Sequence, residues 1–415
     1  MESKNFPFTK AGMISHAKEI ILPYWEKFAC HKATGGFYGS IDNNNQQDET
    51  ESRSIVMTAR YLWAYSASAR QLGEASYLNM ADYAYNTIIN NFIDKEYGGV
   101  FWSVKPDGSP DVAKKQIYGE AFAIYGLSEY AAALIDFDKD KKLAERAMKT
   151  AIELFSFLEQ YALDKGLGGY VEARARNWAE TDDLKLSPKD IDCNKSMNTN
   201  LHVMEAYTNL FRTLPVVFPE EKTIHQQIAS SLAELARVTV KYILNKENHL
   251  VLYFNQDWSG IGNVVSYGHD IEASWLLQEA VEELADKTLI AEVRDAVLGL
   301  AKVSLEQGYD FEKGGLYNEL GHGKLDKTRI WWNQAEAVTG FYNAYHMTGD
   351  EKYLSASEKT WQWICQKQTD YDGGDWFAAV TPDGEPILTE NKGGNWKTAY
   401  HNVRACLEMA RRLKK

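Results

Sequence analysis

A pair of glycines followed by aromatic or β-branched residues recurs along this chain, and this repeat constrains the fold more than any other feature. Its six copies, of which the fourth has lost its glycines, occupy residues 35–38, 98–102, 168–170, 250–254, 314–317 and 373–377. Two copies continue into similar turns, Pro106-Asp107-Gly108 and Pro382-Asp383-Gly384. Because glycine adopts positive φ without strain and Pro-Asp-Gly reverses the chain, the six segments predict short β-hairpins.

Helical patterns flank each of these segments. One set of helices precedes them, at residues 11–28, 76–92, 141–159, 223–244, 289–307 and 351–365. A second set follows them, at residues 53–70, 118–134, 197–212, 269–284, 331–346 and 398–413. In the first helix of the second set, Ile55, Ala59 and Leu62 fall on one apolar stripe with helical spacing. The pattern therefore predicts six helix pairs.

Six helix pairs can stack as an open superhelix or close into a ring. The second set of helices supplies one candidate functional group each: Arg60, Tyr118, His202, His269, Glu336 and His401. A closed ring brings such groups to one axis, whereas an open superhelix spreads them along a groove. We therefore predict an all-α fold, an (α/α)6 barrel that closes as a toroid, with hairpin loops at the face of an axial pocket. Residues 1–415 are expected to form a single catalytic domain.

Composition and charge exclude several classes of protein. The balance of 45% hydrophobic and 25% charged residues is typical of a globular chain. A formal charge of −13 repels polyanions, so nucleic acid is not an expected partner. The chain shows neither a signal-peptide core nor an apolar stretch that could span a membrane, which predicts a cytoplasmic protein without a membrane partner. The four cysteines are isolated and are expected to be free thiols: Cys30, Cys193, Cys365 and Cys406.

Three histidines at similar positions of the repeat, His202, His269 and His401, indicate acid–base chemistry. Imidazole titrates near neutrality, at about 6.5, so two of them can exchange the roles of acid and base. A carboxylate such as Glu272 or Glu336 could hold an imidazole in one tautomer.

Two other kinds of site remain open at this point. The histidines and carboxylates could together bind zinc or manganese, although no H-E-x-x-H or H-x-H spacing occurs. Alternatively, Glu272 and Glu336 could be the acid and base of a glycosidase. No dinucleotide-binding, Walker or G-x-S-x-G motif is present, which disfavours nicotinamide, ATP-driven and serine-hydrolase mechanisms.

Six segments resemble one known family, the N-acylglucosamine 2-epimerase superfamily, and within it the cellobiose 2-epimerases. The similar segments are MTARYLWAYS (57–66), YGEAFAIYGLSEY (118–130), MNTNLHVMEAYT (197–208), SYGHDIEASWLL (266–277), DKTRIWWNQAEAVTGF (326–341) and NWKTAYHNVRACLE (395–408). The resemblance implies an (α/α)6 barrel that epimerises C2 of the reducing-end sugar of a β-1,4-linked disaccharide, without a cofactor or metal. The positions that correspond to site residues of the family are Arg60, Tyr118, Asn198, His202, His269, Glu272, Trp332, Glu336, Trp396 and His401.

The resemblance further implies that His269 and His401 form the acid–base pair. Inversion at C2 requires ring opening, loss of the C2 proton and return of a proton to the opposite face, through a cis-enediol or enediolate. Arg60 is expected to stabilise the negative charge that develops on oxygen, and His202 to assist. Trp332, Trp376 and Trp396 are expected to stack on sugar rings, although aromatic residues equally fill helical cores.

Alternative activities also remain open. They are an aldose–ketose isomerase of mannose-type sugars, a glycosidase, and a sugar-binding protein without catalysis. The expected partner is a disaccharide substrate, and the expected oligomeric state is a monomer or weak homodimer.

Overall fold

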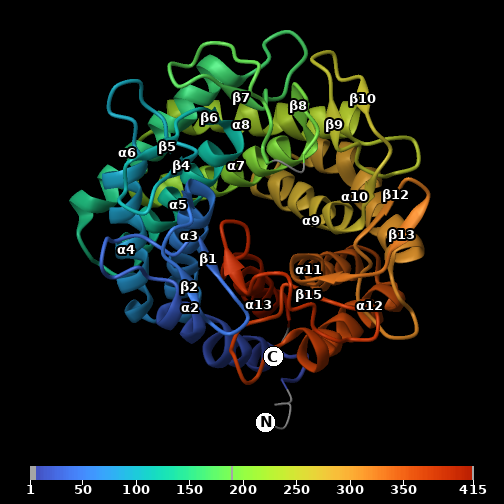
Figure 1. Cartoon of the computed structure of the whole chain (residues 1–415). Helices are drawn as coiled ribbons and strands as arrows, with labels where there is room; N and C mark the ends of the chain where they lie inside the picture. The colour runs from blue at the N-terminus through green and yellow to red at the C-terminus, as the bar shows by residue number, and fades with distance from the viewer. Residues whose placement is uncertain (1–5, 188–189, 414–415) are drawn as a thin grey trace.

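Two concentric rings of helices make up the molecule (Figure 1). The computed structural model describes residues 6–187 and 190–413. The inner ring consists of α3 (Ile55–Leu72), α5 (Ile117–Asp136), α7 (Met197–Val217), α9 (Tyr267–Glu283), α11 (Trp331–Thr348) and α13 (Tyr400–Arg412). The outer ring consists of α1 (Lys10–His16) with α2 (Leu22–Phe28), α4 (Leu78–Thr87), α6 (Lys141–Phe157), α8 (Lys222–Val238), α10 (Lys287–Gly308) and α12 (Glu351–Trp363).

The inner helices form a complete circle. Helix α3 packs against α5, and the contacts continue through α7, α9 and α11 to α13, which returns to α3. Each inner helix also packs against one outer helix, and α13 packs against α1. Because α13 and α3 come from opposite ends of the chain, their contact distinguishes a closed ring from an open superhelix. The prediction of an (α/α)6 barrel is confirmed.

Most outer helices include a wider turn that the apolar pattern does not reveal. Five-residue π-helical turns occur at η1 (Ala17–Ile21), η3 (Ile88–Phe92), η4 (Leu158–Ala162), η5 (Thr239–Ile243) and η6 (Ile364–Gln368). A short 3-10 turn, η2 (Ala75–Tyr77), precedes α4. The predicted ranges 11–28, 76–92 and 223–244 run through these turns, and 141–159 and 351–365 end inside them, since a single π turn leaves the apolar stripe nearly continuous.

Short antiparallel strand pairs join each repeat to the next, and the last pair closes the ring. The pairs are β3 (Arg53–Ser54) with β4 (Ser103–Val104), β6 (Lys115–Gln116) with β7 (Ala173–Arg174), β8 (Lys195–Ser196) with β9 (Tyr253–Phe254), β11 (Val265–Ser266) with β12 (Glu319–Gly321), β14 (Arg329–Ile330) with β15 (Ala379–Val380), and β16 (Gly393–Gly394) with β1 (Ser40–Ile41). In the last pair, Ser40 lies opposite Gly394 and Ile41 opposite Gly393. Backbone hydrogen bonds therefore link the two ends of the chain.

The prediction that each glycine doublet forms a β-hairpin is wrong in one respect. Gly98 and Gly99, at φ of 71° and 70°, lie inside a tight loop closed by the single bridge between Ile93 and Val100. The true hairpins come later in the repeat and add β2 (Gln47–Asp48), β5 (Pro110–Val112), β10 (Gly260–Ile261) and β13 (Lys324–Asp326). The Pro-Asp-Gly turn is confirmed between β4 and β5, where the Gly108 N–H donates to the Lys105 carbonyl at 2.9 Å.

Buried ion pairs fix the inner helices at the end where they begin. A lysine or arginine just before the inner helix binds the aspartate that opens the glycine loop. The pairs are Lys115–Asp94 at 3.0 Å, Lys195–Asp164 at 2.6 Å, Arg329–Asp310 at 2.8 Å and Lys392–Asp370. A polar side chain in the first turn of the inner helix then accepts a loop N–H, as Glu120 accepts from Val100 at 2.9 Å. These contacts hold the hairpin face of the ring in a fixed geometry.

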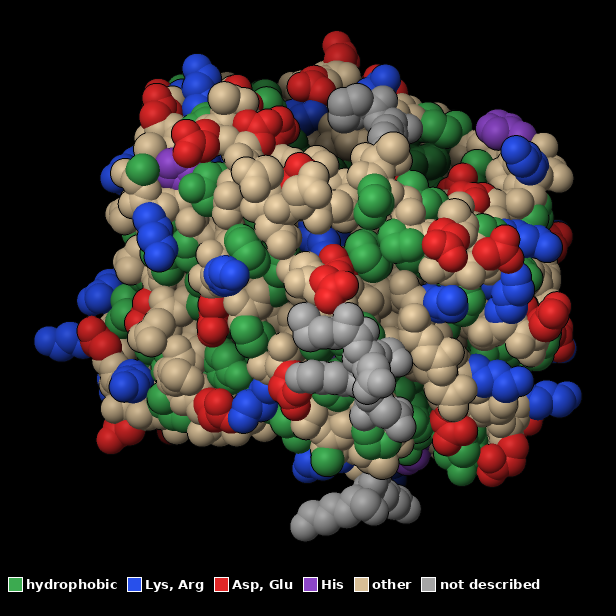
Figure 2. Space-filling view, turned by 60° about the horizontal axis from the view of Figure 1, so that its bottom comes forward, with side chains coloured by type: hydrophobic (Ala, Val, Ile, Leu, Met, Phe, Trp, Pro, Cys, Tyr) green, Lys and Arg blue, Asp and Glu red, His purple; other side chains and the backbone are tan. Residues whose placement is uncertain are grey.

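The outer wall carries charges of both signs. Acidic and basic side chains are interspersed with small groups of hydrophobic ones over the face that Figure 2 shows. Within the described residues, no helix combines the length and the apolar character needed to cross a membrane.

Candidate active site

A cavity of about 440 Å³ lies on the ring axis, at the end where the inner helices begin. Its volume is in the usual range for small-molecule sites. Nine of the predicted site residues line it: Arg60, Tyr118, Asn198, His202, His269, Glu272, Trp332, Trp396 and His401. Closure of the ring therefore brings together side chains that are up to 341 positions apart.

Each of the three histidines in the cavity has its Nδ1 atom bound by the protein. The His401 Nδ1 lies 2.6 Å from Glu336 Oε1, and the His202 Nδ1 lies 2.7 Å from Glu205 Oε2. The His269 Nδ1 lies 2.8 Å from Ser266 Oγ. Their Nε2 atoms have no hydrogen-bond partner in residues 6–187 and 190–413, so they are free to meet a substrate. A carboxylate at Nδ1 favours the tautomer in which Nε2 carries the lone pair.

The environment keeps these imidazoles neutral. Burial lowers the pKa of His269 to about 3. Burial also lowers the pKa of His202, and that of His401 well below its usual range, where the charges of Arg60 and Arg404 add to the effect. Neutral imidazoles with a free Nε2 can accept a proton from carbon or oxygen.

Arg60 is held rigidly at the cavity wall. Its Nη1 donates to the Trp396 carbonyl at 2.6 Å, and its Nη2 donates to Tyr118 Oη at 3.0 Å. The guanidinium lies over the rings of Phe122 and Tyr400, at 4.6 and 5.0 Å from their centroids. A fixed cation against apolar rings is suited to stabilise negative charge on a reacting oxygen.

Arg404, which the sequence did not single out, supports two of the three histidines from behind. Its Nη2 donates to Glu272 Oε1 at 2.6 Å and to Glu336 Oε1 at 2.7 Å. Its Nη1 binds Glu205, which also accepts from Tyr400. Glu205 and Glu336 are the carboxylates that hold His202 and His401, so one guanidinium connects both imidazoles.

The carboxylates of this cluster have divergent acidities. The Arg404 charge and a hydrogen bond from His202 outweigh burial at Glu205, and its pKa falls to about 2. Burial and the neighbouring charge of Glu336 raise the pKa of Glu272, and burial also raises the pKa of Glu336. The cluster therefore holds Glu205 ionised while it disfavours a negative charge on Glu272.

Comparison with known proteins identifies the family. A model of the N-acylglucosamine 2-epimerase (GlcNAc 2-epimerase) family matches residues 36–405. The chain belongs to this family. A cellobiose 2-epimerase of Bacteroides fragilis is 40% identical over 391 residues, which cover 94% of this chain and 95% of that protein.

Solved structures agree with this membership of the N-acylglucosamine 2-epimerase family. The cellobiose 2-epimerase from Bacillus thermoamylovorans superimposes with a TM-score of 0.87 at 33% identity, covering 97% of this chain and 99% of that one. A D-mannose isomerase superimposes with a TM-score of 0.79 at 18% identity, covering 99% of this chain and 100% of that one, and this likeness shows the fold alone. The predicted enzyme class, an isomerase of the carbohydrate 2-epimerase type, is confirmed.

Glu336, predicted to bind substrate, is not among the residues that line the cavity, and it instead contacts His401 as the carboxylate that could hold an imidazole. Its Oε1 is shared by His401 and Arg404, and its Oε2 accepts from Trp275 Nε1 at 3.0 Å. Because both oxygens are engaged and the side chain is buried, Glu336 orients His401 instead.

The same contacts argue against the metal and glycosidase alternatives. Glu272, Glu336 and His401 offer ligand atoms within 4.8 Å of one another. However, the Arg404 guanidinium already binds the facing oxygens of both carboxylates. A metal ion or a glycosidic oxygen between them would have to displace this buried cation.

Trp376 lies in the core, so its predicted stacking on sugar is wrong. The ring is completely buried, and its Nε1 donates to His16 Nε2 at 2.8 Å. Trp332 and Trp396 do line the cavity, and Trp396 is 38% exposed. The loop that carries Trp376 packs against the first outer helices of the chain, where the Asp375 N–H donates to the Ile20 carbonyl at 3.3 Å, and this packing directs the ring away from the axis.

The sequence also missed part of the cavity wall. Leu186, Ser187 and Asp190 come from an irregular segment between β7 and β8, and Asn318 and Trp331 come from the fifth repeat. Asp190 Oδ1 accepts from Tyr253 Oη at 2.9 Å, which attaches the segment to β9. This segment has no periodic pattern, so only its unusual length between two repeats could have drawn attention to it.

Proposed function

We propose that this enzyme inverts C2 of the reducing-end sugar of β-1,4-linked disaccharides, with cellobiose as a substrate. One observation carries the proposal: His269 and His401 present unpaired Nε2 atoms to the same cavity, and both rings contact Trp332, at centroid distances of 4.6 and 5.9 Å. The names of the relatives that match almost the whole chain support the substrate class. Residues 1–415 act as one catalytic domain in this proposal.

The reaction proceeds by removal of the C2 proton from one face and delivery of a different proton to the other face. After the sugar ring opens, one imidazole takes the C2 proton through Nε2, and the electron pair of the C–H bond forms the C1–C2 double bond while O1 becomes negative. The second imidazole, which has taken up the O1 proton through Nε2 during ring opening while O5 takes a proton from water, delivers its proton to the opposite face of C2, and the electrons return from O1 to restore the aldehyde. When the ring closes, the first imidazole gives its proton back to O1 and O5 releases its proton to water, so both imidazoles end neutral. In the reverse direction His269 and His401 exchange roles, as microscopic reversibility demands.

Arg60 stabilises the enediolate oxygen in this scheme. Contacts with the Trp396 carbonyl and the Tyr118 hydroxyl fix the guanidinium before the substrate arrives, so little reorganisation accompanies the charge shift. A preorganised donor of this kind contributes roughly 3–4 kcal/mol in other enzymes. His202 lies edge-on to Tyr118, with ring centroids 5.0 Å apart, and assists by contacting the same sugar hydroxyls.

Asn198 and the two cavity tryptophans position the disaccharide. Asn198 Oδ1 is a buried acceptor without a partner in the described chain, so it is available to a sugar hydroxyl. Trp332 lies deep between the histidines, whereas the exposed Trp396 lies near the mouth. We assign Trp332 to the reacting sugar and Trp396 to the second sugar.

Incubation with cellobiose in D2O, followed by NMR, tests the proposal. We expect glucosyl-mannose that carries solvent deuterium at C2. A ketose product with deuterium at C1 would instead establish an aldose–ketose isomerase. Release of glucose would establish a glycosidase, and binding without any label would leave a sugar-binding protein. The cytoplasmic location and the monomeric or weakly dimeric state stay predictions.

A further inference from the structure

A second cavity lies at the opposite end of the ring, where the inner helices end. Its volume is about 430 Å³, and its floor is formed by Trp63, Tyr125, Trp275 and Arg404. None of these four residues lines the cavity that holds the histidines. We refer to this second space as the back cavity.

The floor of the back cavity contains two buried donors without acceptors. Trp63 Nε1 and Arg404 Nε make no hydrogen bond to any residue that the structure describes. The two side chains are only 4% and 2% exposed, and both pack against the Tyr400 ring. A buried donor without an acceptor costs about 1–3 kcal/mol. A ligand that supplies acceptor atoms at this floor removes that cost.

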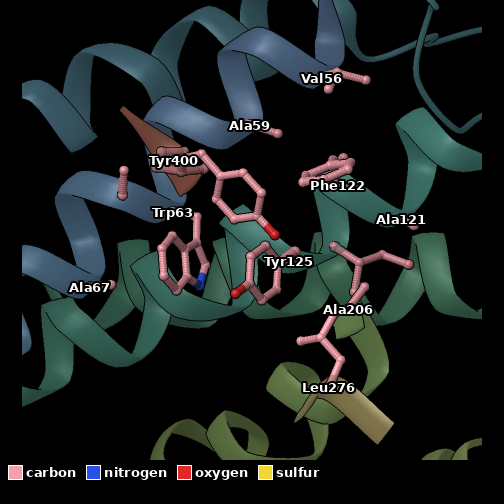
Figure 3. Packing of buried hydrophobic residues seen from close by; sticks show 14 of the residues in the cluster. Val56, Ala59, Trp63, Ala67, Ala121, Phe122, Tyr125, Ala206, Leu276 and Tyr400 are labelled. Atoms are coloured by element: carbon pink, nitrogen blue, oxygen red, sulfur yellow. The ribbon is translucent and has the colours of Figure 1, made fainter. Parts of the chain in front are cut away.

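The faces of the floor aromatics are already covered, so the floor presents N–H and O–H edges. Trp63 and Tyr125 stack on each other with centroids 5.0 Å apart, and Figure 3 shows the indole nitrogen and the Tyr125 hydroxyl at neighbouring edges. Arg404 covers one part of Trp275, and Arg412 lies over it as well. Stacking of a sugar ring on these aromatics is therefore disfavoured, whereas an acceptor oxygen fits.

One cation at the back cavity, Lys10, is not engaged by a carboxylate of the described residues. Its four carboxylates, Glu129, Asp136, Glu279 and Glu408, all form ion pairs with arginines. Lys10 at the rim is exposed and has no ion-pair partner within the described residues. A small anion is thus attracted to the rim as well as accepted at the floor.

We propose that the back cavity binds a small oxyanion, whose carboxylate or phosphate oxygens accept hydrogen bonds from Trp63 Nε1 and Arg404 Nε. This site goes beyond the proposed epimerase function and does not depend on it. Its occupant contacts the one guanidinium that also binds Glu205, Glu272 and Glu336 behind the catalytic histidines. A single side chain, that of Arg404, would therefore separate the ligand from the carboxylates behind the catalytic histidines.

Calorimetric titration of the full-length protein with inorganic phosphate, and separately with acetate, tests this proposal. Saturating cellobiitol, the reduced disaccharide, is present to occupy the active site. We expect saturable binding of at least one of the two anions, and the tighter one identifies the source of the oxyanion. Chloride at the same ionic strength serves as the control for non-specific charge effects.

Two variants decide where the anion binds. Trp63→Phe keeps the stacked ring but removes the indole N–H, and Lys10→Ala removes the rim charge; each is expected to weaken binding at least fivefold. Lys246→Ala, another exposed lysine without an ion pair, is expected to leave the affinity unchanged. The proposal would be overturned if the wild-type protein showed no saturable binding, or if Lys10→Ala and Trp63→Phe bound the anion as tightly as the wild-type protein does. Wild-type affinity in both variants would place the anion outside the back cavity.

Discussion

The two ends of the ring contain cavities of almost equal volume, about 440 and 430 Å³, but differ in the state of their polar groups. At the hairpin end, three imidazoles keep one nitrogen each without a protein partner. At the back end, every lining carboxylate is bound by an arginine, at positions where cations also offset the negative ends of the inner helices. Ring closure thus creates space at both ends, and the unpaired groups decide which end can perform proton transfer.

The largest expected effect concerns the histidines of the hairpin end. We expect His401→Ala and His269→Ala each to lower turnover of cellobiose by about 10²–10⁴, the usual contribution of an acid–base group. His346→Ala, at the other end of α11, is the matched control and should retain the wild-type rate. Steady-state kinetics measure all three, and wild-type turnover in either of the first two variants would remove that residue from the mechanism.

The second prediction concerns Arg404, which separates the two ends. Arg404→Ala leaves three buried carboxylates without their cation, so we expect a loss of about 3–5 kcal/mol in the free energy of unfolding. Arg404→Lys keeps the charge but loses the forked geometry, and we expect it to fold while the pH profile of kcat shifts. Arg237→Ala, which removes an exposed ion pair with Glu292, should cost about 1 kcal/mol or less. Urea denaturation measures the loss of stability, and pH-dependent kinetics measure the shift in the kcat profile. A shifted profile in the folded Arg404→Lys variant would indicate that Arg404 positions the histidines, whereas a loss of stability alone would indicate a structural role.

A third prediction separates the two tryptophans that were expected to bind sugar. Trp376→Ala removes a completely buried ring and should lower the free energy of unfolding by about 3–5 kcal/mol without changing KM. Trp396→Ala removes a partly exposed ring at the mouth and should raise KM about fivefold, which corresponds to about 1 kcal/mol of stacking. A raised KM in Trp376→Ala with unchanged stability would contradict the assignment of Trp376 to the core.

A fourth prediction concerns the pH dependence of stability at the hairpin end. The unfolded chain protonates His269 below about pH 6.5, whereas burial delays this to about pH 3 in the folded protein. The unfolded state therefore binds more protons between these values, and the free energy of unfolding falls as pH falls from about 6.5.

Replacement of His269 by Asn should remove up to about 1.4 kcal/mol per pH unit of this slope between pH 6 and 4. Denaturant titrations across this pH range measure the difference, and identical slopes in wild type and His269→Asn would show that His269 is protonated in the folded state.

Much of this architecture was predictable because it is local or repeated. The apolar spacing of the inner helices located α5 and α11 to within two residues of the observed ends, and the Pro106-Asp107-Gly108 turn was located correctly. The aspartate before four of the glycine doublets, such as Asp94 and Asp164, was also visible in the sequence and could have revealed the repeated ion pairs.

The remaining features depend on contacts between distant repeats. Arg404 looks like an ordinary charged residue near the end of the chain, and its partner Glu205 lies 199 positions away. Trp376 and Trp396 both follow glycines, and nothing in their immediate sequence shows that one is buried against His16. The spacing of residues along the sequence shows periodicity, but it does not show which side of a loop faces the ring axis.

The sequence by itself determined the six helix pairs, the polar group on each inner helix and the chemistry that three imidazoles can perform. Only the tertiary structure decided which nitrogens stay unpaired, because the pairing of β16 with β1 and of α13 with α3 brings Arg404 into the carboxylate cluster. The physical reason is desolvation. A buried charge requires a partner because water no longer solvates it, and closure of the ring is what removes the water around Arg404 and its carboxylates. That condition is met jointly by residues from opposite ends of the chain.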